Sequence, residues 1–394
     1  MVVPLVVKDI AAAVGALLVV ITGTSVIGTL IVPRPVASKL TRQIDRGVNA
    51  GFILITKHIN EYRIRDRVES THAATLLLCQ LVVWLGLFFV GFSLIFWPLV
   101  TGGITAAFHT AGPALWEIGN DRARGAGEQT ILDVASITGI ITVTLQIAYL
   151  PTLYSAFNRR ETDVALLNAR AGVPSWGPEL LARTHYALGT GVSTLDTLPD
   201  LYDTWERWAA DVAESHTTYL PLVRFRSPQG LSSWVTSLLS VLDSAALILA
   251  LSPDNAPKVP ARLCLRSGFQ CFRRVARAMG YEVPDEADPE GGISLTFDEF
   301  MEAWERLRQV GFPMSRDPKD AWPDFVGWRV NYEQAAYQIA AAVDAVPALW
   351  SGPRRHPMKP IPPYRPPRGR VRGPQGSRGP QSPPEPQGVP DPLV

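Results

Sequence analysis

The stretch AATLLLCQLVVWLGLFFVGFSLIFWPLVTGG, residues 73–103, decides the class of this protein. It contains no charged side chain. At about 1.5 Å per helical residue it is longer than the ~30 Å hydrocarbon core of a bilayer. It therefore predicts a membrane-spanning helix over residues 73–100, which ends before the pair Gly102 and Gly103.

Two further stretches predict membrane spans. The first, within residues 1–33, is uncharged from residue 10 onward, and only Lys8, offset by Asp9, precedes it. That flank predicts a retained transmembrane helix rather than a cleaved signal peptide, which would begin with a basic region. The second covers about residues 133–157 and stops at Arg159 and Arg160. The chain is thus predicted to cross the membrane three times.

Composition agrees with a membrane protein that carries a soluble part. The 394 residues include only 19% charged side chains, against about 25% in ordinary soluble domains. The net charge of +1 argues against a nucleic-acid partner, because neutralising phosphates requires an excess of basic residues. Cys79, Cys264 and Cys271 have neither metal-ligand nor CxxC spacing, so they are interpreted as packing residues.

The link over residues 34–72 sets the predicted orientation. Its basic residues are Arg34, Lys39, Arg42, Arg46, Lys57, Arg63, Arg65 and Arg67. By the positive-inside rule the link is cytoplasmic, the N-terminus lies outside, and the chain after residue 157 is cytoplasmic again. Apolar residues three and four apart predict an amphipathic helix in the link. It either lies near the inner leaflet or packs on the soluble part, and the pattern favours neither.

Residues 103–121 are unusual for an outer loop. Residues 104–116 are apolar but too short to cross a membrane, a length typical of re-entrant segments. A polar turn follows, made of Glu117, Ile118, Gly119, Asn120 and Asp121. A span, a short helix, a glycine turn and a second span form the layout of a pore loop, in which irregular backbone lines an aqueous path. The alternative is an ordinary turn with solvated acids.

Two stretches carry a resemblance to a known family. LQIAYLPTLYSAFNRRE, residues 145–161, and WERWAADVAESHTTY, residues 205–219, are similar to stretches in ion-channel-like membrane proteins of high-GC, actinobacterial bacteria. The excess of arginine over lysine suits such a genome. The likeness covers most of the chain up to about Arg355 and implies a bacterial inner-membrane location and an ion-transport role.

Residues 73–157 also resemble the two-helix core of pore-loop potassium channels. That family uses TxGYG followed by Asp, whereas here Glu117 replaces Thr, Asn120 replaces Tyr, and the second Gly is missing before Asp121. Potassium selectivity is therefore not predicted, although rings of Glu117 and Asp121 in a tetramer would attract cations. Gly139 is a candidate gating hinge, and the alternative is close helix packing.

Residues 158–350 predict an all-α cytoplasmic domain. An apolar stripe that includes Trp205 and Trp208 indicates core, Thr296 and Glu299 indicate a capping box before a helix that stops at Gly311, and helices are expected over residues 261–280 and 325–346. The stretch 231–252 is apolar enough to be mistaken for a fourth span. Because crossing there would put the basic residues after it outside, we expect a buried helix whose Asp243 is paired with Arg224 or Arg226.

The sequence predicts no enzyme, metal site or cofactor. It has no nucleophile, Walker or zinc-ligand signature, the acidic stretch 285–300 fails the spacing of a calcium loop, and His185 and His216 are interpreted as surface or packing residues. Residues 351–394 are rich in Pro, Gly and Arg and are expected to be disordered. They could contact anionic lipid or a proline-binding domain, but a solvated tail is the favoured interpretation.

Two functions remain open at this level. The leading hypothesis is a homo-oligomeric, tetrameric membrane protein that passes cations through a degenerate pore loop, with residues 117–121 at the constriction. The alternative is a non-conducting, membrane-anchored interaction or regulatory protein whose helical domain binds a protein partner. Subunit number separates them, because a pore needs several copies around an axis.

Overall fold

The computed structural model describes residues 4–32, 39–116, 125–186, 194–288 and 291–365. All the elements below belong to the compact unit formed by residues up to Pro363. The regular elements within the described ranges are helices, as expected for an all-α protein, and strand-like pairing there is limited to one bridge between Ala348 and Ile361.

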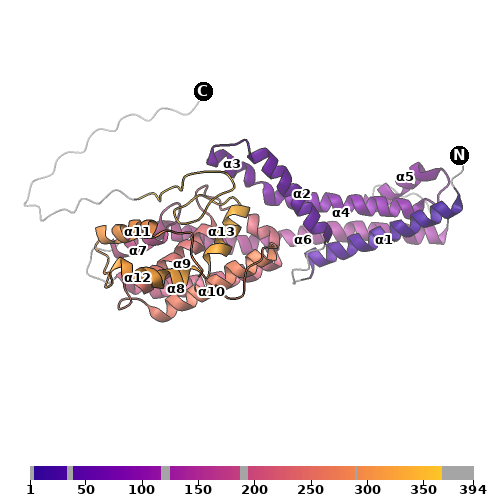
Figure 1. The fold of residues 1–394 in the computed structure, drawn as a ribbon. Helices are drawn as coiled ribbons and strands as arrows, with labels where there is room; N and C mark the ends of the chain where they lie inside the picture. The colour runs from indigo at the N-terminus through magenta and orange to yellow at the C-terminus, as the bar shows by residue number, and fades with distance from the viewer. Residues whose placement is uncertain (1–3, 33–38, 117–124, 187–193, 289–290, 366–394) are drawn as a thin grey trace, which may run out of the picture. The chain divides into compact units, whose positions relative to one another are not determined.

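The apolar stretches form a bundle of α1 (Leu5–Leu30), α4 (His72–Phe96), α5 (Gly103–Trp116) and α6 (Ala126–Ala171) (Figure 1). Helices α1 and α4 approach each other closely in this bundle. A Cβ atom added to Gly15 would lie 2.4 Å from the carbonyl oxygen of Gly91, and one added to Gly91 would lie 2.8 Å from Val19. Small residues that let helix backbones approach are typical of membrane helix packing.

The outward faces of this bundle are apolar. Exposed large side chains include Val14, Leu17, Val20, Val82, Val90, Ile137, Ile141 and Ile147. Several buried positions are polar instead, among them Thr22, Ser25, Gln80 and Gln146. A water-soluble bundle would show the reverse pattern, so this surface suits lipid.

Among the residues that the structure describes, four helices are long and apolar enough to cross a membrane: α1, the helical stretch Tyr62–Phe96, α6, and α9 (Trp234–Leu251). They differ in burial. Every residue of α9 is buried among neighbouring helices, whereas only about a fifth of the apolar windows of α1 and α6 is buried. The predicted burial of residues 231–252 agrees with this packing.

The basic link contains two helices, α2 (Lys39–Thr56) and α3 (Tyr62–Glu69). The hydroxyls of Thr29 on α1 and Thr41 on α2 share a hydrogen bond of 2.9 Å. Arg65 on α3 is fully buried and its Nε donates to Asp344 at 2.5 Å. Helix α2 thus packs on α1 and α4 of the apolar bundle, whereas α3 is tied to the helical part.

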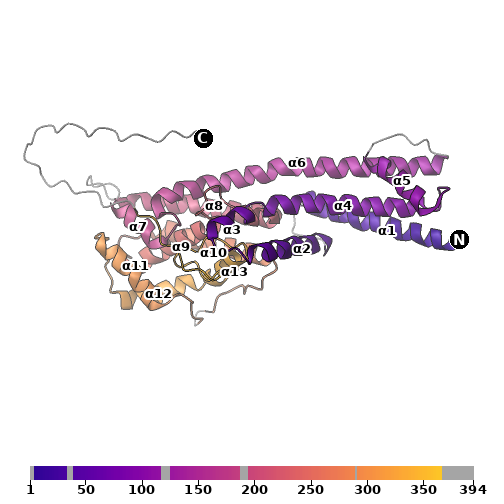
Figure 2. The same cartoon turned by 90° about the horizontal axis from the view of Figure 1, so that it is seen from above.

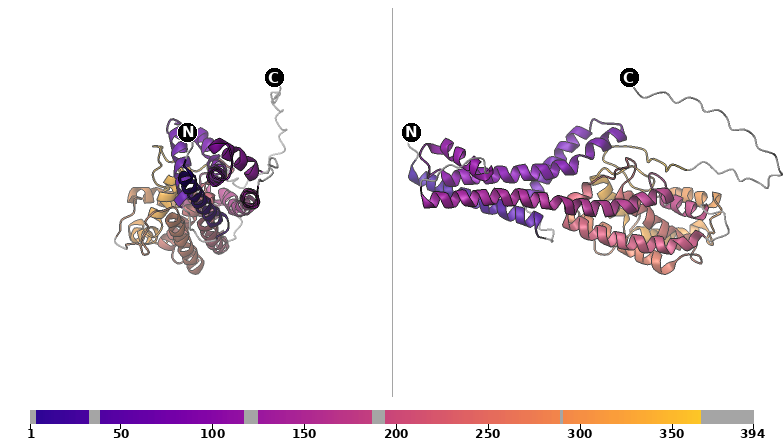
Figure 3. Two further views of the ribbon diagram at one scale, coloured as in Figure 1. Left: turned by 90° about the vertical axis from the view of Figure 1, so that its right-hand side faces the viewer. Right: turned by 180° about the vertical axis from the view of Figure 1, so that it is seen from behind.

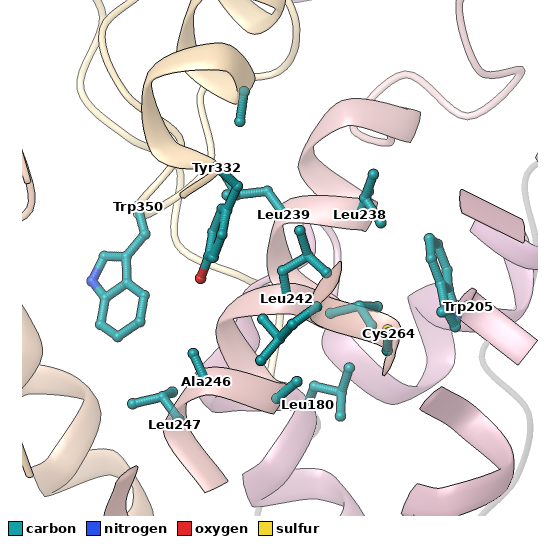
Figure 4. Close-up of a cluster of buried hydrophobic side chains, with 14 of the residues drawn as sticks. Leu180, Trp205, Leu238, Leu239, Leu242, Ala246, Leu247, Cys264, Tyr332 and Trp350 are labelled. Atoms are coloured by element: carbon teal, nitrogen blue, oxygen red, sulfur yellow. The ribbon is translucent and has the colours of Figure 1, made fainter. Parts of the chain in front are cut away.

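The remaining helices form the second packed region. They are α7 (Gly177–Tyr186), α8 (Leu198–Thr218), α10 (Lys258–Ala278), α11 (Phe297–Gln309), α12 (Pro318–Arg329) and α13 (Glu333–Ala342), with 3₁₀ turns η1 (Thr194–Thr197) and η2 (Leu220–Arg224). The core around α9 includes Leu180, Trp205, Leu242, Cys264 and Trp350 (Figure 4). Trp205 and Trp208 are core residues, as predicted.

The cysteines of α10 behave as packing residues. Cys264 and Cys271 are fully buried and reduced. Burial raises the pKa of the Cys271 thiol to about 12, because a thiolate would lose its hydration there.

The local helix signals near residue 300 are confirmed. Thr296 Oγ1 accepts from the backbone of Glu299, and Glu299 accepts from the backbone of Thr296, which completes the capping box. Gly311 follows α11 with a φ of 74°, the left-handed conformation that glycine adopts without strain.

Two expectations for the helical region are wrong. Residues 325–346 do not form one helix: α12 ends at Arg329, where Asn331 Nδ2 donates to the carbonyls of Gly327 and Trp328 and satisfies the helix end. Asp243 pairs with Arg329 and accepts from Tyr332 at 2.7 Å, not with Arg224 or Arg226. Those two arginines instead face α2 and α3, where Arg226 Nη1 donates to Asp66 at 2.5 Å.

Candidate functional site

The short helix α5 lies between the two helices of the predicted pore-loop pair. It contacts α4 through Phe108 and Phe89, whose ring centroids are 5.3 Å apart. At its other end, Ser136 of α6 donates to the carbonyl of Ala114 at 2.8 Å. Ser136 is ten residues into α6, or about 15 Å along the helix axis. Helix α5 thus starts near the end of α4 and its last turn packs well inside the bundle (Figure 2).

Gly139 explains how α5 and α6 pack so closely. A Cβ atom at Gly139 would lie 2.1 Å from the carbonyl oxygen of Leu115. Glycine is therefore required at this position for helix contact, which is the packing role considered for it. The last carbonyls of α5 carry the negative end of that helix's dipole, and two of them face Ser136 and Gly139 of the same chain.

The predicted constriction residues Glu117, Ile118, Gly119, Asn120 and Asp121 lie outside the described residues. What the structure places is the segment on each side of them, Trp116 at the end of α5 and Gly125 before α6. Among the described residues, no group of His, Cys, Asp or Glu has the geometry of a metal site.

Helix α6 connects the apolar bundle to the helical domain without a break (Figure 3). The domain boundary expected at residue 158 lies inside this helix. Its buried face continues through both regions at three- and four-residue steps, through Ala135, Gly139, Thr142, Gln146, Tyr149, Leu153, Ala156, Arg160, Val164, Leu167 and Ala171. The apolar bundle and the helical domain are therefore joined by one continuous helix, α6.

Arg160 fastens α6 to the helical domain. Its guanidinium is fully buried and forms an ion pair with Glu161 at 2.7 Å. It also donates to the carbonyls of Leu222 at 2.9 Å and Phe225 at 2.7 Å. A buried guanidinium is stable only when its donors are satisfied in this way.

His216 is the partner of Arg160 on α8. Arg160 Nη1 lies 2.9 Å from His216 Nε2, and because a guanidinium only donates, Nε2 accepts and the neutral ring carries its proton on Nδ1, 3.0 Å from Ser215 Oγ. Complete burial and the charge of Arg160 hold the pKa of His216 well below its usual value.

The two stretches that carry the family resemblance meet at this point. Trp208 Nε1 donates to the carbonyl of Arg160 at 3.1 Å, and the rings of Tyr149 and Tyr219 are 5.5 Å apart. On the surface, Arg159 pairs with Asp211 at 3.1 Å. Sequence inspection placed both arginines together as a flank of the span, but only Arg159 is exposed. Arg160 and His216 are 56 positions apart, and nothing in the sequence indicates that they pair.

A cavity of about 160 Å³ lies where α1, α2, α4 and α6 meet α8, η2 and α10. Its lining includes Gln80, Tyr149 and Arg224. Sequence inspection did not predict it, because its walls come from segments spread between residues 28 and 281.

Comparison with known proteins gives no relative: no family model matches the chain, and no curated protein or solved structure is significantly similar to it. The resemblance to ion-channel-like membrane proteins therefore remains a prediction from the two quoted stretches.

Proposed function

We propose that this protein is an oligomeric, ion-channel-like membrane protein in which α4, α5 and α6 of several copies surround a cation path. The observation that carries the proposal is the position of α5, a helix too short to cross, whose last turn packs against Ser136 and Gly139 inside the apolar bundle. A segment that enters and leaves from one side is the layout of a pore loop.

In this proposal the acids that follow α5 select the sign of the ion. Glu117 and Asp121 come directly after the helix in sequence, so a tetramer would hold four copies of each near the path. A ring of carboxylates concentrates cations over anions. The missing TxGYG pattern argues for a cation path without strong preference for potassium over sodium.

A second candidate, a non-conducting membrane-anchored regulatory protein, has its own supporting observation. The carbonyls of Ala114 and Leu115 are occupied by α6 within one chain, whereas a helix end that stabilised a passing ion would face the path. In that case α6 and Arg160 would serve to hold the helical domain at the membrane for a partner.

The deciding experiment is cation flux through the full-length protein in liposomes, with Na⁺ and K⁺ compared. We expect flux from the natural chain and none from Gly119→Trp. Gly86→Trp is the matched control, because Gly86 is exposed on α4 and a Cβ atom there meets nothing within 4 Å. Glu117→Gln and Asp121→Asn should lower the preference for cations over anions.

Subunit number supplies the second measurement. A tetramer in lipid supports the pore, because one α5 cannot enclose a path. A monomer, or inserted oligomeric protein that passes no ion, would overturn the pore and favour the membrane-anchored protein.

A further inference from the structure

The cavity at the inner end of the bundle has the features of a ligand site. At about 160 Å³ it is far larger than the ~10–15 Å³ that one water molecule needs. Its lining comes from both regions of the unit, α1, α2, α4 and α6 on one side and α8, η2 and the end of α10 on the other.

Gln80 is the feature that points to a ligand. Its side chain is 2% exposed, yet its amide makes no hydrogen bond to any other part of the chain that the structure describes. Tyr149, 5% exposed, lines the same cavity, and within the described ranges its hydroxyl also has no protein partner. Buried polar groups are normally satisfied, so these two are placed to bind something in the cavity.

The charges around the cavity favour an anion. Among the described residues, Arg42 and Arg224 line it together with one carboxylate, Asp45. Arg224 Nε is 3.8 Å from Asp45 Oδ1, too far for a hydrogen bond, and its Nη1 donates to the carbonyl of Ala342 at 3.2 Å. Guanidinium donors therefore remain for a ligand. Two cations and one anion leave a net charge of +1 for a bound group to neutralise.

The position of the cavity relates it to the membrane surface. Residues that line the cavity adjoin exposed apolar side chains of the bundle: Ile27 lies next to Gly28 on α1, Leu78 lies between Leu76 and Gln80 on α4, and Ile147 lies two residues before Tyr149 on α6. Guanidinium, hydroxyl and amide donors beside these side chains match the oxygens of a phosphate group, for which arginine is well suited.

We propose that this cavity binds a phosphate-bearing anion, either the headgroup of an anionic phospholipid or a soluble phosphate ester, between Arg42, Arg224 and Gln80. Because the walls come from the spans, the basic link and the helical domain, a bound phosphate would tie the three together. The proposal is independent of ion conduction.

The test uses the full-length protein and two probes. Binding is followed by native mass spectrometry, and by the thermal unfolding midpoint in nanodiscs of phosphatidylcholine with or without added phosphatidylglycerol. Glycerol 1-phosphate is the soluble probe. We expect phosphatidylglycerol to raise the midpoint, and Arg42→Gln or Gln80→Leu to weaken its binding by about tenfold, the size of a lost hydrogen bond to a charged group.

Arg46→Gln is the matched control, since Arg46 is exposed on the same helix one turn away and does not line the cavity. If Arg42→Gln and Arg46→Gln weaken binding equally while Gln80→Leu has no effect, the attraction is that of a basic surface and the proposal fails. The proposal also fails if neither probe binds.

The two probes separate the two sources of phosphate. If glycerol 1-phosphate raises the midpoint and this effect depends on Arg42, the ligand is soluble. If only the lipid raises the midpoint, the ligand is a lipid headgroup. Arg42 is exposed, so its variant remains informative if Gln80→Leu does not fold.

Discussion

Three arginines, Arg65, Arg160 and Arg329, are fully buried, and each is satisfied by acceptors from distant segments. Their burial could not be predicted from the sequence. A charged residue next to an apolar stretch is normally a solvated flank, and the sequence does not show which acceptors tertiary packing will bring to it. Asp243 illustrates the same limit, because the arginines nearest in sequence are not its partner.

The Arg329→Met variant should lose about 3–5 kcal/mol of unfolding free energy, because it leaves Asp243 and Glu333 as buried carboxylates without their cation. Arg274→Met is the control. Its ion pair with Glu214 is half-exposed or more on both sides, so its loss should cost less than about 1 kcal/mol. Denaturant unfolding of the solubilised protein, followed by tryptophan fluorescence, measures both, and equal losses would contradict the prediction.

Stability should fall in mild acid because of His216. In the folded protein its pKa is held well below the usual 6.5, so near and below pH 6.5 the unfolded chain binds a proton that the native chain does not. The free energy of unfolding therefore keeps its full value above about pH 6.5 and falls as the pH drops below it. Lowering the pH from 7 to 5 should cost about 2 kcal/mol at this site.

His216→Gln is the comparison for this pH effect. The groups that face the imidazole are Arg160, Ser215 and the Trp234 ring, with Glu161 paired to Arg160, and the variant leaves all of them in place. The stability gap between the two proteins should therefore narrow as the pH falls. A gap that is constant across this pH range would show that His216 does not titrate differently in the folded state.

At the scale of elements, the sequence predicts where helices form better than it predicts whether a helix faces protein or lipid. The capping box of α11 and the stop at Gly311 are local signals and were predicted correctly. Hydropathy alone could not separate α9 from a span, because a buried core helix and a lipid-facing helix have the same composition. The basic residues after α9 provided the distinction. The break between α12 and α13 was missed because it depends on one side chain, Asn331, turning back onto the helix end.

Gly15→Leu should disrupt the pairing of α1 with α4. A side chain at Gly15 would overlap the carbonyl of Gly91, and overpacking of this kind costs about 1–3 kcal/mol or more. Gly23→Leu on the same helix is the matched control, since a Cβ atom there meets nothing within 4 Å. The thermal midpoint in detergent should drop for the first variant only. Similar midpoints would mean that the two helices are not held by this contact.

At the scale of the whole molecule, the bundle exposes apolar side chains whereas α9 and its neighbours enclose theirs. The sequence predicts this division, because charged residues are scarce in the apolar stretches and frequent in the chain after Arg160. It could not predict that the link would be tied to the helical domain through Arg65–Asp344, Arg226–Asp66 and Arg355–Glu69, because each pair joins residues far apart in the chain.

The predicted topology can be measured with reporter fusions. Alkaline phosphatase inserted after Asn120 should be active outside the cell, and a green fluorescent protein fused after Arg355 should fluoresce in the cytoplasm. Phosphatase after Arg355 is the control and should be inactive. If α9 crossed the membrane, the last two results would be reversed, so the same fusions decide between three spans and four.

The unbroken α6 has a mechanical consequence. Its 46 residues extend over about 69 Å, and Arg160 clamps the helix in the half that packs in the helical domain. A helix held near one point acts as a lever, so we expect a change in membrane thickness or tilt at its apolar arm to press the other arm against α7 and α9, apart from any bending at Pro151 between the arms. Bilayer tension would thus reach the helical domain directly, as a torque.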